Sequence, residues 1–323
     1  MINTLKRLML TSGVSGREQK ICEAIRKEVE PYADEVFVDA MGNLVAHKRG
    51  KGKRVMLAAH MDEIGFLVTS ITSKGIIKVA PIGAINYTSS TGAGVISERG
   101  VCGIMSSSDT TPSAKDIFID IGATSKAQAE KRVSVGEFFV HTPSLKRLIG
   151  TRYVGRPIDD RIGCAILIEV LRTVKNTDND LYFVFTTQEE VGSRGARPIT
   201  YTIEPEIAIA VDITRTDDKP GEESVNIHMG AGPTIKIKDA SVICSHELVL
   251  QMRELAEQGK IKYQNEMITN GGTDTSVMQI AKRGCRAGAI SVPCAYIHTT
   301  NEMIDINDAR GAVRLLSVIA ERI

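Results

Sequence analysis

The stretch Val55-Met-Leu-Ala-Ala-His60-Met-Asp62-Glu63-Ile-Gly65 joins an apolar run to a group of polar residues. Its five apolar residues are typical of a strand buried on both faces, as in the centre of a parallel sheet. A histidine after such a strand is most often an ordinary core or surface residue. Asp62 changes this interpretation, because a metal-ligating imidazole usually donates its second N–H to a carboxylate, and residues two apart share one face of an extended segment.

Two later apolar runs also lead into acidic residues. Leu181–Phe185 precedes Glu189 and Glu190, and Ile207–Val211 ends at Asp212. The carboxyl ends of parallel strands meet in one crevice of an open α/β sheet, so we expect these distant residues to form one site. Helical and strand-like segments alternate through this half of the chain. The pattern predicts an α/β fold with a mixed, largely parallel sheet flanked by helices.

The character of the sequence changes from about Phe66 to Arg152. Short β-branched segments are separated there by glycine, proline and serine; they are Gly75–Pro81, Gly94–Ser97, Ile117–Ile121 and Glu137–His141. This spacing predicts a small β-barrel or sandwich inserted into the first domain. The predicted division is therefore a discontinuous catalytic domain, 1–65 and 153–323, with a β-rich insertion at 66–152.

Local patterns predict several further elements. Ser15-Gly-Arg-Glu18 is a capping-box pattern that predicts the start of a helix. Glu35–Asp39 and Leu44–Lys48 predict a hairpin around Met41-Gly-Asn43. A last helix is expected from about Asn307 to Ile323.

Composition limits the possible partners. The 323 residues include 40 basic and 39 acidic side chains, a formal charge of +1 without a long basic run. We therefore expect no nucleic-acid or membrane partner. The six cysteines show no Cys-x-x-Cys spacing, and buried free thiols are the simplest interpretation. These features favour a cytoplasmic protein.

Each acidic motif also has an ordinary structural explanation. Glu189 and Glu190 can be a solvated helix start, and Asp212 can cap a strand-to-loop turn. Asp159-Asp160-Arg161 can be an N-cap with an ion pair. In an extended turn, however, neighbouring side chains diverge, so one of the two glutamates can bind a metal while the other faces a bound water.

Taken together, the motifs contain the ligands of a two-metal hydrolase. Zinc and cobalt accept imidazole and carboxylate ligands, and paired ions can activate water while polarising a carbonyl. The set comprises His60, Asp62, Glu63, Asp159, Asp160, Glu189, Glu190, Asp212 and the late Ile-His298. Gly271-Gly-Thr-Asp274 predicts a turn and helix cap that lines the pocket, with Asp274 as a weaker candidate for a substrate contact. Four other histidines are expected to be structural or exposed: His47, His141, His228 and His246.

The order and spacing of these motifs resemble the M42 metallo-aminopeptidases, the glutamyl- and deblocking-aminopeptidase group that forms tetrahedral particles. The resemblance spans essentially the whole chain and implies a zinc-exopeptidase type of fold. It implies metal ligation by His60, Asp159, Glu190, Asp212 and His298. Asp159 would bridge two ions, because the second position of the Asp-Asp motif varies between Asp and Asn among relatives. His298 and Glu190 would complete one site, and His60 and Asp212 the other.

The same resemblance implies the chemistry and the assembly. Glu189 matches the family's general base, and Asp62 matches the residue that orients His60. Two divalent ions per subunit, Zn²⁺ or Co²⁺, are implied, together with hydrolysis of the N-terminal residue of peptides that have a free N-terminus. A homo-dodecamer built from dimers is also implied.

Three alternatives remain open on the residues alone. M20 and M28 peptidases share this metal chemistry, which would extend the activity to carboxypeptidase or deacylase reactions. A glycoside hydrolase would use two carboxylates, but it would need neither His60 nor His298. A scaffold protein would bind metal and hydrolyse nothing.

Overall fold

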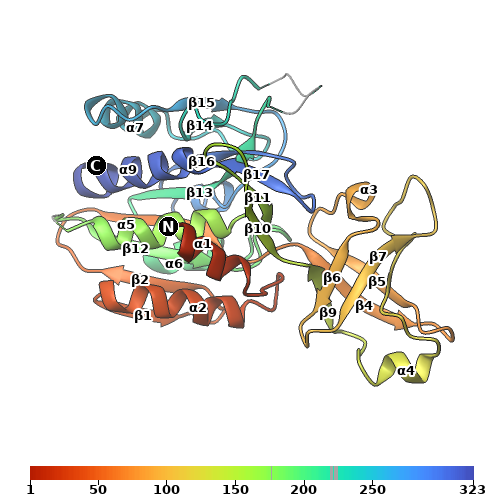
Figure 1. Cartoon of the computed structure of the whole chain (residues 1–323). Helices are drawn as coiled ribbons and strands as arrows, with labels where there is room; N and C mark the ends of the chain where they lie inside the picture. Colours follow the sequence, from red (N-terminus) through yellow and green to blue (C-terminus); the bar gives the residue numbers. More distant parts are fainter. Residues whose placement is uncertain (176, 219–220, 222–224) are drawn as a thin grey trace.

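The computed structural model describes residues 1–175, 177–218, 221 and 225–323, which form an α/β body beside a β-barrel (Figure 1). The α/β body is built on one large mixed sheet. Its strands are β1 (Glu35–Val38), β2 (Leu44–Lys48), β3 (Arg54–His60), β10 (Ser144–Arg147), β11 (Arg152–Arg156), β12 (Asp180–Thr186), β13 (Ile207–Arg215), β14 (Thr234–Lys238), β15 (Gln264–Met267), β16 (Arg286–Ala295) and β17 (Glu302–Asp305).

The strand order of the large sheet is β1-β2-β12-β3-β13-β16-β17-β11-β10, with β14 paired to both β15 and β16. The four strands β12, β3, β13 and β16 are mutually parallel, whereas β1, β2, β17, β11 and β10 are added in antiparallel fashion. The parallel centre brings the carboxyl ends of β3, β12 and β13 to one edge. This confirms the predicted fold class and the convergence of the three apolar runs.

Helices cover both faces of the sheet (Figure 1). The first face packs against α1 (Ile2–Met9), α2 (Gln19–Val29), α5 (Arg161–Thr173), α7 (His246–Gln258) and α9 (Ile306–Arg322). The second face packs against α6 (Ala196–Ile203) and α8 (Thr275–Gln279). Within β3, Leu57 faces the first layer and Met56 and Ala58 face the second. Successive side chains of a strand alternate between faces, so both faces of this apolar run are buried.

The insertion forms a closed barrel with the strand order β4-β5-β8-β7-β6-β9. Its elements are β4 (Gly65–Ile71), β5 (Ile77–Ile82), α3 (Tyr87–Ser90), β6 (Gly94–Ser97), β7 (Cys102–Ser107), β8 (Ile117–Asp120), α4 (Lys126–Glu130) and β9 (Phe138–His141). Phe66, Met105 and Phe139 fill its interior. The structure thus selects the barrel over the sandwich. The domain limits stay a prediction, and β10 belongs to the large sheet although its residues lie within 66–152.

The capping-box prediction at Ser15 is wrong. Helix α2 begins at Gln19 without a side-chain cap, and the Ser15 hydroxyl instead donates to Asp62 Oδ2 at 2.7 Å. Glu18 Oε1 accepts from the Gly16 N–H at 2.8 Å. A tertiary partner therefore takes the hydroxyl that the local pattern assigned to the helix end.

Candidate metal centre

Six of the predicted site residues line one cleft of about 750 Å³, and Asp62 lies outside its lining. His60 ends β3, and Asp212 lies within β13 rather than at its end. The remaining cleft-lining candidates come from three loops next to these strands: Asp159 before α5, Glu189 and Glu190 after β12, and His298 between β16 and β17. Residues from distant parts of the sequence thus face a shared space, as the parallel centre of the sheet requires.

Asp159 lies between the two histidines. Its Oδ1 is 3.1 Å from His60 Nε2, and its Oδ2 is 3.1 Å from His298 Nε2. His298 Nε2 is also 3.5 Å from Glu190 Oε2, and His60 Nε2 is 4.0 Å from Asp212 Oδ1. One carboxylate therefore presents each of its oxygens to a different imidazole, with a further acidic group beside each ring.

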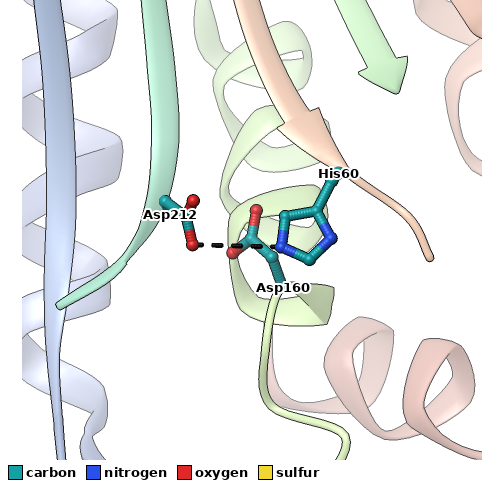
Figure 2. A group of neighbouring side chains, drawn as sticks. All are labelled: His60, Asp160 and Asp212. Atoms are coloured by element: carbon teal, nitrogen blue, oxygen red, sulfur yellow. Dashed lines mark ion pairs between the residues drawn. The ribbon is translucent and has the colours of Figure 1, made fainter. Parts of the chain in front are cut away.

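Two groups of side chains have the composition of a metal site. Asp159, Glu190 and His298 offer ligand atoms within 4.8 Å of one another, and so do His60, Asp160 and Asp212. Figure 2 shows the second group, in which the three side chains point toward one another from β3, β13 and the start of α5. Among the described residues, the buried atoms Asp160 Oδ2 and Glu190 Oε1 have no hydrogen-bond partner. Imidazole and carboxylate donors with spare acceptor capacity fit divalent cations.

The charges of the cluster also fit cations. Burial raises the pKa of Glu190 to about 8, and repulsion from Asp159 adds to the effect. Burial raises the pKa of Asp212 to about 7, where His60 opposes the shift and Asp159 reinforces it. Burial lowers the pKa of His298, but the hydrogen bond to Asp159 and the charge of Glu190 reverse this and raise it to about 9. The site holds more buried acid than its imidazoles balance, and bound cations compensate such an excess.

Asp160 caps helix α5, as predicted, and its side chain also lies beside His60 and Asp212, which was not predicted. Its Oδ1 accepts the Gly163 N–H at 2.9 Å at the start of α5. A side chain at Gly163 would place its Cβ 2.2 Å from Asp160 Oδ2, so this close approach requires glycine. The ion pair of Arg161 is with Glu63, because Arg161 Nη2 lies 3.2 Å from Glu63 Oε1.

Asp62 holds two parts of the site together beneath the cleft. It is fully buried, and its Oδ1 lies 3.4 Å from His60 Nδ1, which also lies 3.2 Å from the main-chain oxygen of Asp62. Oδ1 also accepts the Glu189 N–H at 3.0 Å, and Oδ2 accepts the Glu190 N–H at 3.3 Å. The predicted contact between Asp62 and the imidazole is present, and the contacts to the two glutamates extend it.

Glu189 and Glu190 diverge, as expected for neighbours in a turn. Glu190 faces His298, whereas Glu189 Oε1 accepts the Ser193 hydroxyl at 3.2 Å. Burial raises the pKa of Glu189 well above its usual value. Asp274 does not line the cleft, although its neighbour Thr273 does, and its Oδ2 accepts the Thr186 hydroxyl at 2.6 Å.

Glu302 is a site residue that the sequence did not reveal. Its Oε2 accepts the N–H groups of Ile158 at 2.8 Å and Asp159 at 3.1 Å. Its Oε1 accepts the His298 N–H at 3.2 Å and Arg156 Nη1 at 2.7 Å. Glu302 lies in the polar segment that follows His298, where no apolar pattern predicts burial. Its position can be recognised only from the tertiary structure.

The family model described as M42 glutamyl aminopeptidase matches residues 42–315. The chain belongs to this family. A putative aminopeptidase of Acetivibrio thermocellus is 40% identical over 323 residues, covering 98% of this chain and 97% of the relative. A solved aminopeptidase of Desulfurococcus kamchatkensis has a TM-score of 0.96 at 31% identity, covering 100% of this chain and 94% of that one. The TET1 peptidase of Pyrococcus horikoshii has a TM-score of 0.89 at 32% identity, covering 100% and 99%.

The M42 assignment gives the cleft its chemical class. The protein is a metal-dependent aminopeptidase, a hydrolase, and the two side-chain groups are candidate sites for its divalent ions. The M20 and M28 families are set aside by this assignment. Among the described residues, no helix is long and apolar enough to cross a membrane.

We predict that Glu302→Gln destabilises the aminopeptidase by about 3–5 kcal/mol, because it removes the counter-charge of buried Arg156. Glutamine keeps the volume but replaces one of the two accepting oxygens with an NH₂ donor, so the lost hydrogen bonds add to the loss of charge. The free energy of unfolding in urea and the metal content per subunit are the measurements. Glu204→Gln, which breaks an exposed pair with Lys282, is the control and should change little. Wild-type stability together with full metal content in Glu302→Gln would contradict the assigned role.

Proposed function

We propose that the chain removes the N-terminal residue of peptides by a two-metal mechanism with Glu189 as general base. The observation that carries this proposal is the Asp159 carboxylate, whose two oxygens each lie 3.1 Å from the Nε2 of a different histidine. A carboxylate in that position is suited to bridge two cations. Membership of the M42 family supports the same chemistry.

The ligands divide into two sets that share Asp159. His60 and Asp212 would hold one ion, with Asp160 beside them, and His298 and Glu190 would hold the other. The donors are imidazoles and carboxylates without a thiolate, which suits Zn²⁺ or Co²⁺. Bound divalent ions supply a water of lowered pKa and polarise the scissile carbonyl.

Glu189 moves the proton in this mechanism. It lines the cleft without belonging to either three-residue ligand group. Its carboxylate accepts the proton of the attacking water and later donates it to the leaving amine. The Ser193 hydroxyl, 3.2 Å from Oε1, holds the carboxylate in place, and the Asp62 contact to the Glu189 N–H fixes the turn. Asp62 also orients His60 through Nδ1.

The assembly proposed for this chain is a homo-dodecamer built from dimers. The Pyrococcus horikoshii relative is described as able to assemble into a tetrahedron or a large octahedral shell. In this chain, Ile149 in the turn between β10 and β11 is 97% exposed, and Val135 on the barrel is 65% exposed. Contact with another subunit at these positions would remove apolar surface from water. A cytoplasmic location stays a prediction.

Glu189→Gln should retain both ions while losing most turnover. The substitution keeps the side-chain shape but removes the proton acceptor, and loss of a general base lowers the rate by roughly 10²–10⁴. Turnover of leucine p-nitroanilide and metal content by plasma spectrometry are the measurements. An ion missing from this variant would mean that Glu189 is a ligand, and that the roles of the two glutamates are exchanged.

Asp159→Ala should empty the site more completely than any other single ligand substitution, because both ions lose a shared ligand and their mutual repulsion is no longer offset. His60→Ala should affect one ion more than the other. Asp160→Asn should cause the smallest loss of bound metal, because asparagine keeps an oxygen that accepts the Gly163 N–H. Metal content per subunit compares all three. If Asp160→Asn loses both ions while Asp159→Ala keeps two, the bridge is assigned one residue too early.

The purified protein should elute as a particle many times the 35.0 kDa mass of the chain. Replacing exposed Ile149 with lysine should weaken the assembly, because it introduces a charge into an apolar contact. Multi-angle light scattering of both proteins at micromolar concentration measures the mass. A monomeric wild type would contradict the proposed dodecamer.

A further inference from the structure

A buried lysine lines the same cleft outside the metal centre. Lys236 in β14 is only 1% exposed, yet it is part of the cleft wall. Its Nζ lies 2.8 Å from Asp239 Oδ2 and 2.9 Å from Glu266 Oε1. An ammonium carries three N–H donors, and these two carboxylates engage at most two of them. In the part of the chain that the structure describes, no third acceptor is paired with this ammonium, so one N–H is left for a ligand of the cleft that Lys236 lines.

The surroundings of Lys236 donate hydrogen bonds to both carboxylates. Asp239 Oδ1 accepts the N–H groups of Ser241 at 2.8 Å and Val242 at 2.9 Å. Glu266 Oε2 accepts the Thr234 hydroxyl at 2.6 Å. Hydrogen bonds donated to a carboxylate favour its charged state. The group Lys236, Asp239 and Glu266, which we name the lysine triad, has a formal net charge of −1.

The lysine triad lies near the candidate metal centre, because β13 and β14 flank β16, and Asp212 and Thr234 are both paired with Ser291. The positive charge of Lys236 acts on the Asp212 carboxyl and lowers its pKa against the effect of burial. Nearby walls are formed by Ser241, Ile268 and Gly272. A Cβ at Gly272 would lie 2.9 Å from Ser241 Oγ, so little space separates these two segments. A peptide cannot continue past a fully buried strand residue, so only a terminal group fits against Lys236.

We propose that Lys236 forms the floor of the subsite for the side chain of the substrate's N-terminal residue, and that this subsite favours an uncharged side chain ending in an oxygen acceptor, with glutamine as the reference. This inference rests on the aminopeptidase reaction proposed above. Asp239 and Glu266 act as positioning residues, because each reaches the substrate only through the Lys236 ammonium.

The chemistry of the floor discriminates between side-chain classes. An amide oxygen accepts the remaining N–H of Lys236 without adding charge. A glutamate would bring a third carboxylate to one ammonium that already faces two, so charge repulsion disfavours it. An apolar side chain of similar length, such as that of methionine, leaves the buried N–H donor without a hydrogen-bond partner. A site built for hydrogen bonding therefore binds the transition state of such a substrate less tightly.

The first test compares the wild-type protein, loaded with Co²⁺ or Zn²⁺, on the p-nitroanilides of glutamine, glutamate and methionine. We expect kcat/KM for glutamine to exceed that for methionine by roughly ten- to a hundredfold, the range of a hydrogen bond to a charged group. Glutamine should also exceed glutamate. Methionine at or above glutamine overturns the acceptor role of the floor, and glutamate at or above glutamine overturns the charge argument.

The second test changes the charge of the triad and keeps Lys236. Glu266→Gln raises the net charge from −1 to 0, so the ratio of kcat/KM for glutamate over glutamine should rise about tenfold. Both values come from one preparation, so a partial loss of folded or metal-loaded protein cancels in the ratio. Glu204→Gln removes the same charge at the exposed Lys282 pair and should leave the ratio unchanged. An equal ratio in Glu266→Gln and wild type overturns the proposal.

Lys236→Met removes the donor itself and should abolish the advantage of glutamine over methionine. If this variant does not fold, the wild-type substrate panel and the Glu266→Gln variant still test the proposed subsite. Failure of the proposed function is a different result: no p-nitroanilide is cleaved by protein that holds its metal ions. Cleavage of all three substrates at similar rates overturns the subsite alone.

Discussion

Two buried carboxylates behind the cleft fix the loops that form the candidate metal centre. Asp62 accepts the N–H groups of Glu189 and Glu190 and contacts His60, so one side chain ties β3 to the turn after β12. Glu302 accepts the N–H groups of Asp159 and His298 and ties the loop before α5 to the loop after β16. Each ligand loop is thus fixed through its main chain. The ligand side chains remain free to face the cleft.

These supporting hydrogen bonds are needed because the acidic groups that line the cleft repel one another. Burial and repulsion raise the pKa values of Glu190 and Asp212, so the folded apoprotein bears acid groups that water would solvate better. The supporting carboxylates are themselves secured, Asp62 by the Ser15 hydroxyl and Glu302 by Arg156. Binding cations relieves the repulsion, so metal binding and stability are coupled here.

The sequence predicted those features that depend on local pattern or on family resemblance. Apolar runs located β3, β12 and β13, because strands buried on both faces need continuous apolar residues. The spacing of His60 and Asp62 indicated their contact. Glu302 and the role of Ser15 were missed, because each depends on a partner far along the chain: Glu302 reaches Asp159 across 143 positions and Ser15 reaches Asp62 across 47. No period in the sequence encodes such contacts, nor the closure that made the insertion a barrel.

The proposed hydrolytic centre and the proposed side-chain subsite lie on different strands of the sheet. The proposed ligands and base come from β3, β13 and the loops beside the parallel centre, whereas the lysine triad comes from β14, β15 and the turn after β14. β14 pairs with β16 and β15, and not with β3 or β12. Residues of the triad can therefore change the charge and hydrogen bonding of the subsite without moving Asp62 or Glu302, which fix the ligand loops. A fold arranged in this way can keep one hydrolytic centre while its side-chain subsite varies.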